Sequence, residues 1–191
     1  MKKGFTLIEL LIVIGILAVL ATITVLVLNP AQLFAQARDS QRISDLDSMK
    51  GAIALYLTTV VTTDLGNDTG GAFTCGTNFG GSAAGASSTF AATTLAHGGV
   101  LTVDGAGWVA VNIASTTGGS PLPRLPRDPV NTTSTGYAYG YSCDNTNKTF
   151  ELNANMESAR YQNGGADDVE STDGGNNSGI YEVGTDPALD L

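Results

Sequence analysis

The first 28 residues constrain the fold most, because they hold an apolar run too long for an ordinary globular helix. The run extends from Phe5 to Leu28, and a helix of that length measures roughly 36 Å at ~1.5 Å per residue. That length suffices to cross a hydrocarbon core of ~30 Å. Lys2 and Lys3 precede the run and are expected to stay on the cytoplasmic side. The sequence therefore predicts a membrane-spanning helix.

This segment differs from an ordinary secretory signal, whose apolar region has about 7 to 15 residues and ends in a small-residue cleavage site. Here the apolar run is longer, no Ala-x-Ala site follows Leu28, and the small residue Gly4 precedes the run instead. The run also contains a carboxylate, Glu9, near the positive end of the helix dipole. Ionisable groups in membrane segments are costly and usually functional, so Glu9 is expected to have a charged partner.

The stretch Gly4 to Leu10, GFTLIEL, resembles the leader junction of type IV pilins and of the pseudopilins of type II secretion. The resemblance implies that prepilin peptidase cuts between Gly4 and Phe5 and methylates the new Phe5 amine. It also implies that Glu9 pairs with the Phe5 amine of a neighbouring subunit, which agrees with the high cost of an unpaired buried charge. The apolar run alone would also fit a plain membrane anchor.

A second helical pattern follows Asn29-Pro30, where the proline is expected to bend the helix without ending it. Apolar side chains recur at steps of three and four, and polar side chains fill the other side. The acidic and basic residues there, such as Asp39 and Arg42, are interpreted as solvated surface pairs. One helix from Phe5 to about Val61 is predicted. The expected stripe comprises Leu33, Phe34, Ala37, Ile43, Leu46, Met49, Ile53, Leu57 and Val60.

The remaining chain predicts a loop-rich β head. The expected elements are a loop over 64–86, a short helix over 88–96, hairpins pairing 100–103 with 108–113 and 137–142 with 149–155, and a last strand over 180–183. His97 is expected as a solvated helix-end residue and Trp108 as a core residue. The alternation of Phe150, Leu152 and Ala154 predicts one buried sheet face.

The stretch Leu125 to Asn131, LPRDPVN, followed by Tyr137-Ala138-Tyr139, resembles the segment that leads into the sheet of major pseudopilins, although Val130 stands where tryptophan is common. The predicted fold is α+β and pilin-like, with a helical spine on a small antiparallel sheet. The predicted parts are a leader (1–4), a membrane and filament-core helix (5–28), an amphipathic spine (29–62) and a β head (63–191).

Two cysteines, Cys75 and Cys143, fall in the part expected outside the membrane, where one disulfide is the natural interpretation and two buried free thiols the alternative. The chain is acidic, with 9 basic and 18 acidic residues. Loss of the leader would remove Lys2 and Lys3 and leave 7 basic residues, a poor balance for binding nucleic acid through the bulk surface.

The C-terminal stretch from Gln162 is rich in Asp, Gly and Asn. Asp167, Asp168 and Asp173 are candidate calcium ligands, because hard cations take six to eight oxygens. The resemblance supports this, since major pseudopilins carry a calcium site in such a loop. A solvated loop without any cofactor is the competing interpretation.

The leading functional hypothesis is a structural subunit of an extracellular type IV pilus-like filament. Its expected partners are copies of itself, prepilin peptidase, and the ATPase and platform proteins of the inner membrane, since the chain has no phosphate-binding loop. Before assembly it should span the cytoplasmic membrane once, and afterwards lie in a surface or periplasmic filament. The alternatives are a type II secretion pseudopilin and a membrane-anchored binding protein. With one histidine and no catalytic cluster, an enzyme is not expected.

Overall fold

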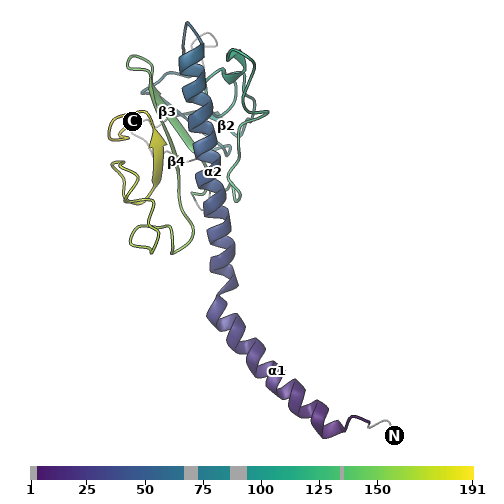
Figure 1. The fold of residues 1–191 in the computed structure, drawn as a ribbon. Helices are drawn as coiled ribbons and strands as arrows, with labels where there is room; N and C mark the ends of the chain where they lie inside the picture. Colours follow the sequence, from purple (N-terminus) through teal and green to yellow (C-terminus); the bar gives the residue numbers. More distant parts are fainter. Residues whose placement is uncertain (1–3, 67–72, 87–93, 134–135) are drawn as a thin grey trace.

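The computed structural model describes residues 4–66, 73–86, 94–133 and 136–191, which form a long bent helical spine and a head (Figure 1). Helix α1 spans Leu7–Leu28 and helix α2 spans Pro30–Thr59. Only Asn29 separates them, in a left-handed conformation with φ 40°. Asparagine tolerates this conformation, and proline suits a first helical position because its missing N–H needs no partner there. The predicted bent helix is confirmed, with its helical geometry interrupted at Asn29.

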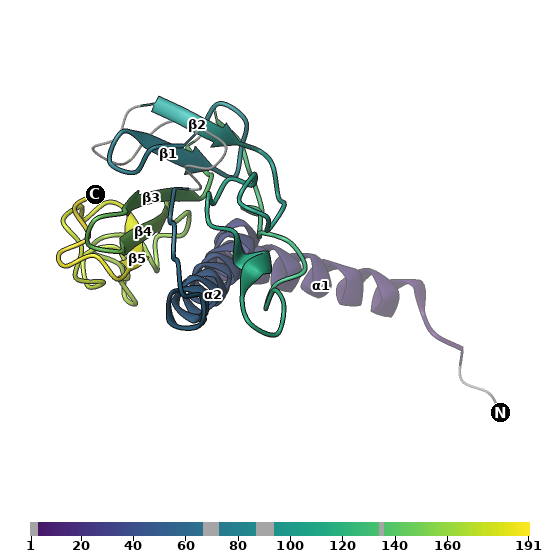
Figure 2. The same cartoon turned by 90° about the horizontal axis from the view of Figure 1, so that it is seen from above.

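Helix α1 extends away from the head (Figures 1 and 2). None of its residues is buried, although almost all of them are apolar. Among the described residues, the spine is the one helix long and apolar enough to cross a membrane. Since exposed apolar surface on this scale is unfavourable in water, α1 requires a bilayer or other helices around it.

The head contains a five-stranded sheet in the order β2-β1-β3-β4-β5. The strands are β1 (Asn78–Gly81), β2 (Thr94–Gly98), β3 (Gly140–Asp144), β4 (Thr149–Ala154) and β5 (Tyr181–Gly184). The predicted hairpin of β3 and β4 and the predicted last strand are confirmed. The prediction of a purely antiparallel sheet is wrong, because β1 and β2 pair in parallel and the sheet is mixed.

The core lies between α2 and one face of this sheet. Leu46, Met49 and Ile53 of α2 are fully buried in one cluster with the side chains of Phe150 and Leu152. The predicted buried face of β4 is therefore confirmed. The first part of the predicted helical stripe is wrong, because Leu33, Phe34 and Ala37 stay exposed while Ala35 is the buried residue of this turn.

The first half of the head departs from the prediction. Strand β1 lies inside the predicted loop over 64–86, and Thr94–Ala96 belong to β2, not to a helix; residues 88–93 of the predicted helix lie outside the described residues. His97 is half-buried in β2, with Nδ1 2.8 Å from the Gly107 carbonyl oxygen, so its assignment to a solvated helix end is wrong.

The predicted hairpin over 100–113 does not form as two regular strands. In the described structure, the predicted arms are joined only by a bridge between Asp104 and Asn112 and by the Trp108 N–H, which donates to the Val100 carbonyl at 2.8 Å. Between these two links, the Leu101 carbonyl accepts from the Leu125 N–H at 2.9 Å. The Leu101 backbone therefore joins the proline-rich connector over 118–129. Trp108 is fully buried, as predicted, and its indole N–H donates to the Pro126 carbonyl at 3.0 Å.

An ion-pair network joins the spine to the head, where the sequence predicted solvated pairs. Arg42 and Asp39 of α2 are both fully excluded from solvent, and Arg42 Nη1 donates to Asp39 Oδ1 at 2.6 Å. The Arg42 guanidinium also binds Asp128 of the connector through two hydrogen bonds. Arg38 pairs with Glu157 nearby. The solvated-pair prediction is wrong here because the connector covers Arg42.

Candidate processing and assembly site

The Gly4–Phe5 peptide bond lies in a non-helical segment that precedes α1. Phe5 is 74% exposed, and a side chain added at Gly4 would meet nothing within 4 Å. An extended, exposed backbone is what a peptidase requires of its substrate. The geometry of this bond therefore suits the predicted cleavage.

Thr6 and Glu9 form a capping box at the N-terminus of α1. The Thr6 hydroxyl accepts from the Glu9 N–H at 3.3 Å, and Glu9 Oε2 accepts from the Thr6 N–H at 2.9 Å. The Thr6 hydroxyl also donates to the same carboxylate oxygen at 2.6 Å. In the single chain the carboxylate thus stabilises its own helix, and the charge lies one turn from Phe5.

Glu9 forms no ion pair within the described part of the chain. Its surroundings on α1 are exposed apolar side chains such as Leu10 and Ile12. A carboxylate with neutral partners, placed on a helix that has to enter an apolar environment, is incompletely compensated. The arrangement leaves it available to a positive charge from another molecule.

A sequence model of the prokaryotic N-terminal methylation motif matches residues 1–25. This is the prepilin-type motif of type IV pilins and pseudopilins, and it implies processing by prepilin peptidase. No curated protein and no solved structure matches the chain significantly. With the exposed α1 and the spine packed on a sheet, the motif supports a type IV pilin/pseudopilin-type protein, a structural class, whose precursor is anchored in a membrane.

Cys75 and Cys143 of the head form a disulfide, as predicted. Cys143 lies on β3 and is fully buried, whereas Cys75 precedes β1. The bond thus ties the segment before β1 to the centre of the sheet, across 68 sequence positions.

The three candidate calcium ligands are held by separate partners. Asp167 pairs with Arg160, Asp168 accepts from the Gly164 and Ser171 N–H groups, and Asp173 accepts from the Glu182 N–H at 2.7 Å. Among the described residues no group of three or more acidic, cysteine or histidine side chains is placed to hold a metal. Calcium binding remains a prediction for the C-terminal loop.

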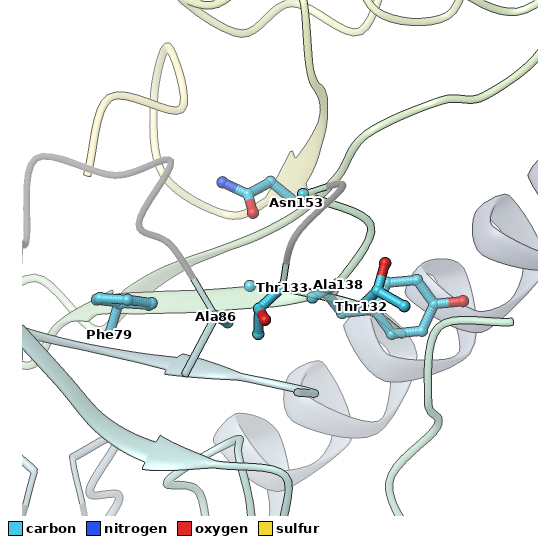
Figure 3. Close-up of a pocket in the computed structure, with 9 residues that line it drawn as sticks. Phe79, Ala86, Thr132, Thr133, Ala138 and Asn153 are labelled. Carbon is cyan, nitrogen blue, oxygen red and sulfur yellow. The ribbon is translucent and has the colours of Figure 1, made fainter. Parts of the chain in front are cut away.

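A small pocket lies between β1, β3, β4 and the residues Thr132, Thr133, Gly136 and Ala138 (Figure 3). Its volume for the centre of a water molecule is about 10 Å³, so it holds about one water. Asn153 lines it, and the buried Nδ2 of this residue has no hydrogen-bond partner within the described structure. The pocket suits a bridging water and is too small for a substrate.

Proposed function

We propose that this chain is the structural subunit of an extracellular type IV pilus-like filament. In this proposal, prepilin peptidase cleaves between Gly4 and Phe5, and subunits then assemble by packing α1 helices side by side. The observation that carries the proposal is the combination of the methylation motif with a 22-residue helix on which no residue is buried. Such a helix can bury its apolar surface only against lipid or against other copies.

Glu9 supplies the specificity of assembly in this proposal. Its carboxylate, held one turn from Phe5 by the capping box, pairs with the Phe5 amine of the adjacent subunit. Opposite charges in an apolar core are tolerated when they are paired, and a subunit in wrong register would leave both unpaired. The ATPase that drives assembly and the inner-membrane platform are separate proteins.

A type II secretion pseudopilin is the second candidate function. It is favoured by the segment Leu125 to Pro129, whose Leu125 is fully buried and whose Asp128 binds Arg42 of the spine. The same residues carry the resemblance to major pseudopilins. Release of filaments into the medium favours the pilus, whereas loss of protein secretion on deletion of this chain favours the pseudopilus.

A substitution series at Glu9 tests the proposal. Glu9→Gln keeps a capping-box side chain but removes the charge, so it should insert in the membrane and fail to form filaments. Thr22→Val is the matched control, because it removes one polar group of α1 and leaves the carboxylate. Normal filaments from Glu9→Gln would contradict the assembly role, and filament loss in Thr22→Val would show that the assay is not specific to the charge.

A further inference from the structure

The two flanks of the spine carry opposite charge. In both views the C-terminal segment around β5 lies on one side of α2, and the 3-10 turn η2 (Ile113–Ser115) lies on the other, with the connector that follows it (Figures 1 and 2). The C-terminal segment from Arg160 to Leu191 holds seven acidic residues and one arginine. The connector over 118–129 holds Arg124, Arg127 and the single acid Asp128, which Arg42 neutralises.

The connector that carries Arg124 and Arg127 is held in place at several points. Leu125 is buried in the core, the Pro126 carbonyl accepts from Trp108, and Asp128 is bound to Arg42. Anchored at these points, the segment leaves the Arg124 and Arg127 side chains exposed. Pro123, Pro126 and Pro129 fix φ between the anchors and lower the conformational freedom of the backbone further.

Among the residues that the structure describes, neither arginine has a charged partner. Three other arginines of the described chain form ion pairs with carboxylates, whereas Arg124 and Arg127 form none. With the Asn131 amide oriented so that both of its polar atoms find partners, its neutral oxygen accepts from the Arg127 guanidinium, at 2.7 Å from Nε and 3.0 Å from Nη2. The two side chains thus present unneutralised positive charge on an acidic protein.

The opposite flank contains a hollow suited to such a side chain. Its volume for the centre of a water molecule is about 230 Å³, against about 10 Å³ for the pocket beside Asn153, so it has room for a side chain. Three carboxyl groups line it, from Asp173, Glu182 and Asp186, against one ammonium group from Lys50. The hollow is therefore acidic overall.

The carboxylates of this hollow are held in place by neutral donors. Asp173 accepts from the Gly175 and Glu182 N–H groups, and Asp186 accepts from the Thr149 hydroxyl at 2.9 Å. None of the three forms an ion pair among the described residues. Burial raises the pKa of Asp173 and of Glu182, as expected of carboxyl groups that lack a cation.

A helical filament brings these two flanks together. The face of α2 opposite the sheet is exposed (Figure 1). In the proposed filament this face points toward the core, which leaves the flanks toward neighbouring heads. Each subunit of a helix meets the next through two different surfaces, because the contact is heterologous. We propose that Arg124 and Arg127 of one subunit dock on the hollow lined by Asp173, Glu182 and Asp186 of a second copy. This inference rests on the proposed filament function.

Charge reversal and charge exchange in the full-length protein test this contact. R124E/R127E should lower the yield of sheared filaments at least tenfold, because both contacting flanks are then acidic and repel each other. Asp190 is exposed beside the hollow, with its N–H donating to Asp186 at 3.3 Å. The exchange R124E/R127E/D186K/D190K restores opposite charge and has the same net charge as the original chain, so its yield should return to within about threefold. R124K/R127K, which keeps the charge, is the conservative control and should assemble. Formation of the Cys75–Cys143 disulfide in the membrane fraction reports that each head has folded.

The outcomes separate this contact from the filament function itself. If the original chain forms filaments and R124E/R127E forms as many, the contact is wrong and the filament function stands. A loss that the charge exchange does not repair also overturns the pairing of these two flanks. If the original chain forms no filaments at all, the proposed function fails first.

Discussion

Arg42 of the spine and Asp128 of the connector are joined by two hydrogen bonds, at 2.7 Å from Nε to Oδ2 and 3.1 Å from Nη2 to Oδ1. Both side chains are fully excluded from solvent. The Asp128 carboxylate also accepts from the Val130 and Asn131 N–H groups, and Asp39 shares the guanidinium. This paired charge fixes the connector, and with it the two exposed arginines, to helix α2.

Removal of the Asp128 charge should destabilise the head strongly. Asp128→Asn leaves a buried guanidinium short of one counter-charge, which typically costs about 3–5 kcal/mol. Urea unfolding of the detergent-solubilised chain, followed by the fluorescence of the single tryptophan, Trp108, measures the change. Asp167→Asn is the control, since its pair with Arg160 is exposed and should contribute nothing measurable. Equal stability of the two variants would contradict the importance of the buried pair.

The position of Arg42 explains why the sequence alone did not predict this pair. Asp39 and Arg42 occupy the same three- and four-residue steps as Leu46, Met49 and Ile53, so the buried stripe of α2 contains two charged residues. A pattern search that follows apolar residues assigns them to the solvated side. Two signals could have predicted the pair: the position of Asp39 and Arg42 in the register of the buried stripe, and the acid Asp128 between Pro126 and Pro129.

Whether the other features could be predicted depends on whether their contacts are local or distant in the sequence. The spine and the β3–β4 hairpin depend on neighbours in sequence, and their periodicity or turn residues predicted them. Strand β2 pairs in parallel with β1, and the Leu101 backbone bonds to Leu125, through contacts that no local pattern specifies. The Gly4–Glu9 junction was predictable because its residues are contiguous.

Loss of the disulfide should lower the free energy of unfolding by about 4 kcal/mol, the value expected from chain entropy for a loop of 68 positions. The double variant Cys75→Ser/Cys143→Ser isolates this effect in urea unfolding. Reductant should destabilise the original chain by a similar amount and leave the double variant unchanged. A double variant as stable as the oxidised chain would show that the bond does not constrain the unfolded state.

The stability of the head should fall as the pH rises from 5 to 8. Burial, together with the Glu182 and Asp186 carboxylates, raises the pKa of Glu151 from its ordinary 4.5 to about 8. The folded state therefore favours the protonated acid, and this contribution, complete below pH 4.5, is lost as the pH rises through 8. The expected loss between pH 5 and 8 is about 3 kcal/mol.

Glu151→Gln provides the control for this pH dependence, because glutamine is neutral over the whole range. Its unfolding free energy should change less between pH 5 and 8 than that of the original chain, and at pH 8 the variant should be the more stable of the two. Parallel pH profiles for both proteins would contradict the assignment to Glu151.

Gly80 is required by a close approach inside the head. A Cβ at this position would lie 1.7 Å from the Trp108 carbonyl oxygen, beside the irregularity between Phe79 and Gly80 in the β1–β2 pairing. Gly80→Ala should therefore destabilise the head by at least about 2 kcal/mol in thermal or urea unfolding. Gly51→Ala is the matched control. Gly51 lies on the exposed side of α2, and a Cβ there would meet nothing within 4 Å, so the substitution should stabilise the helix by about 1 kcal/mol. The same sign for both changes would be inconsistent with this packing.

The most direct test of the central claim is mass spectrometry of the N-terminus of the protein recovered from sheared surface filaments, with electron microscopy of the same fraction. The account predicts filaments whose subunits begin at an N-methylated Phe5. Subunits that still begin at Met1 and remain single molecules in the membrane would contradict it.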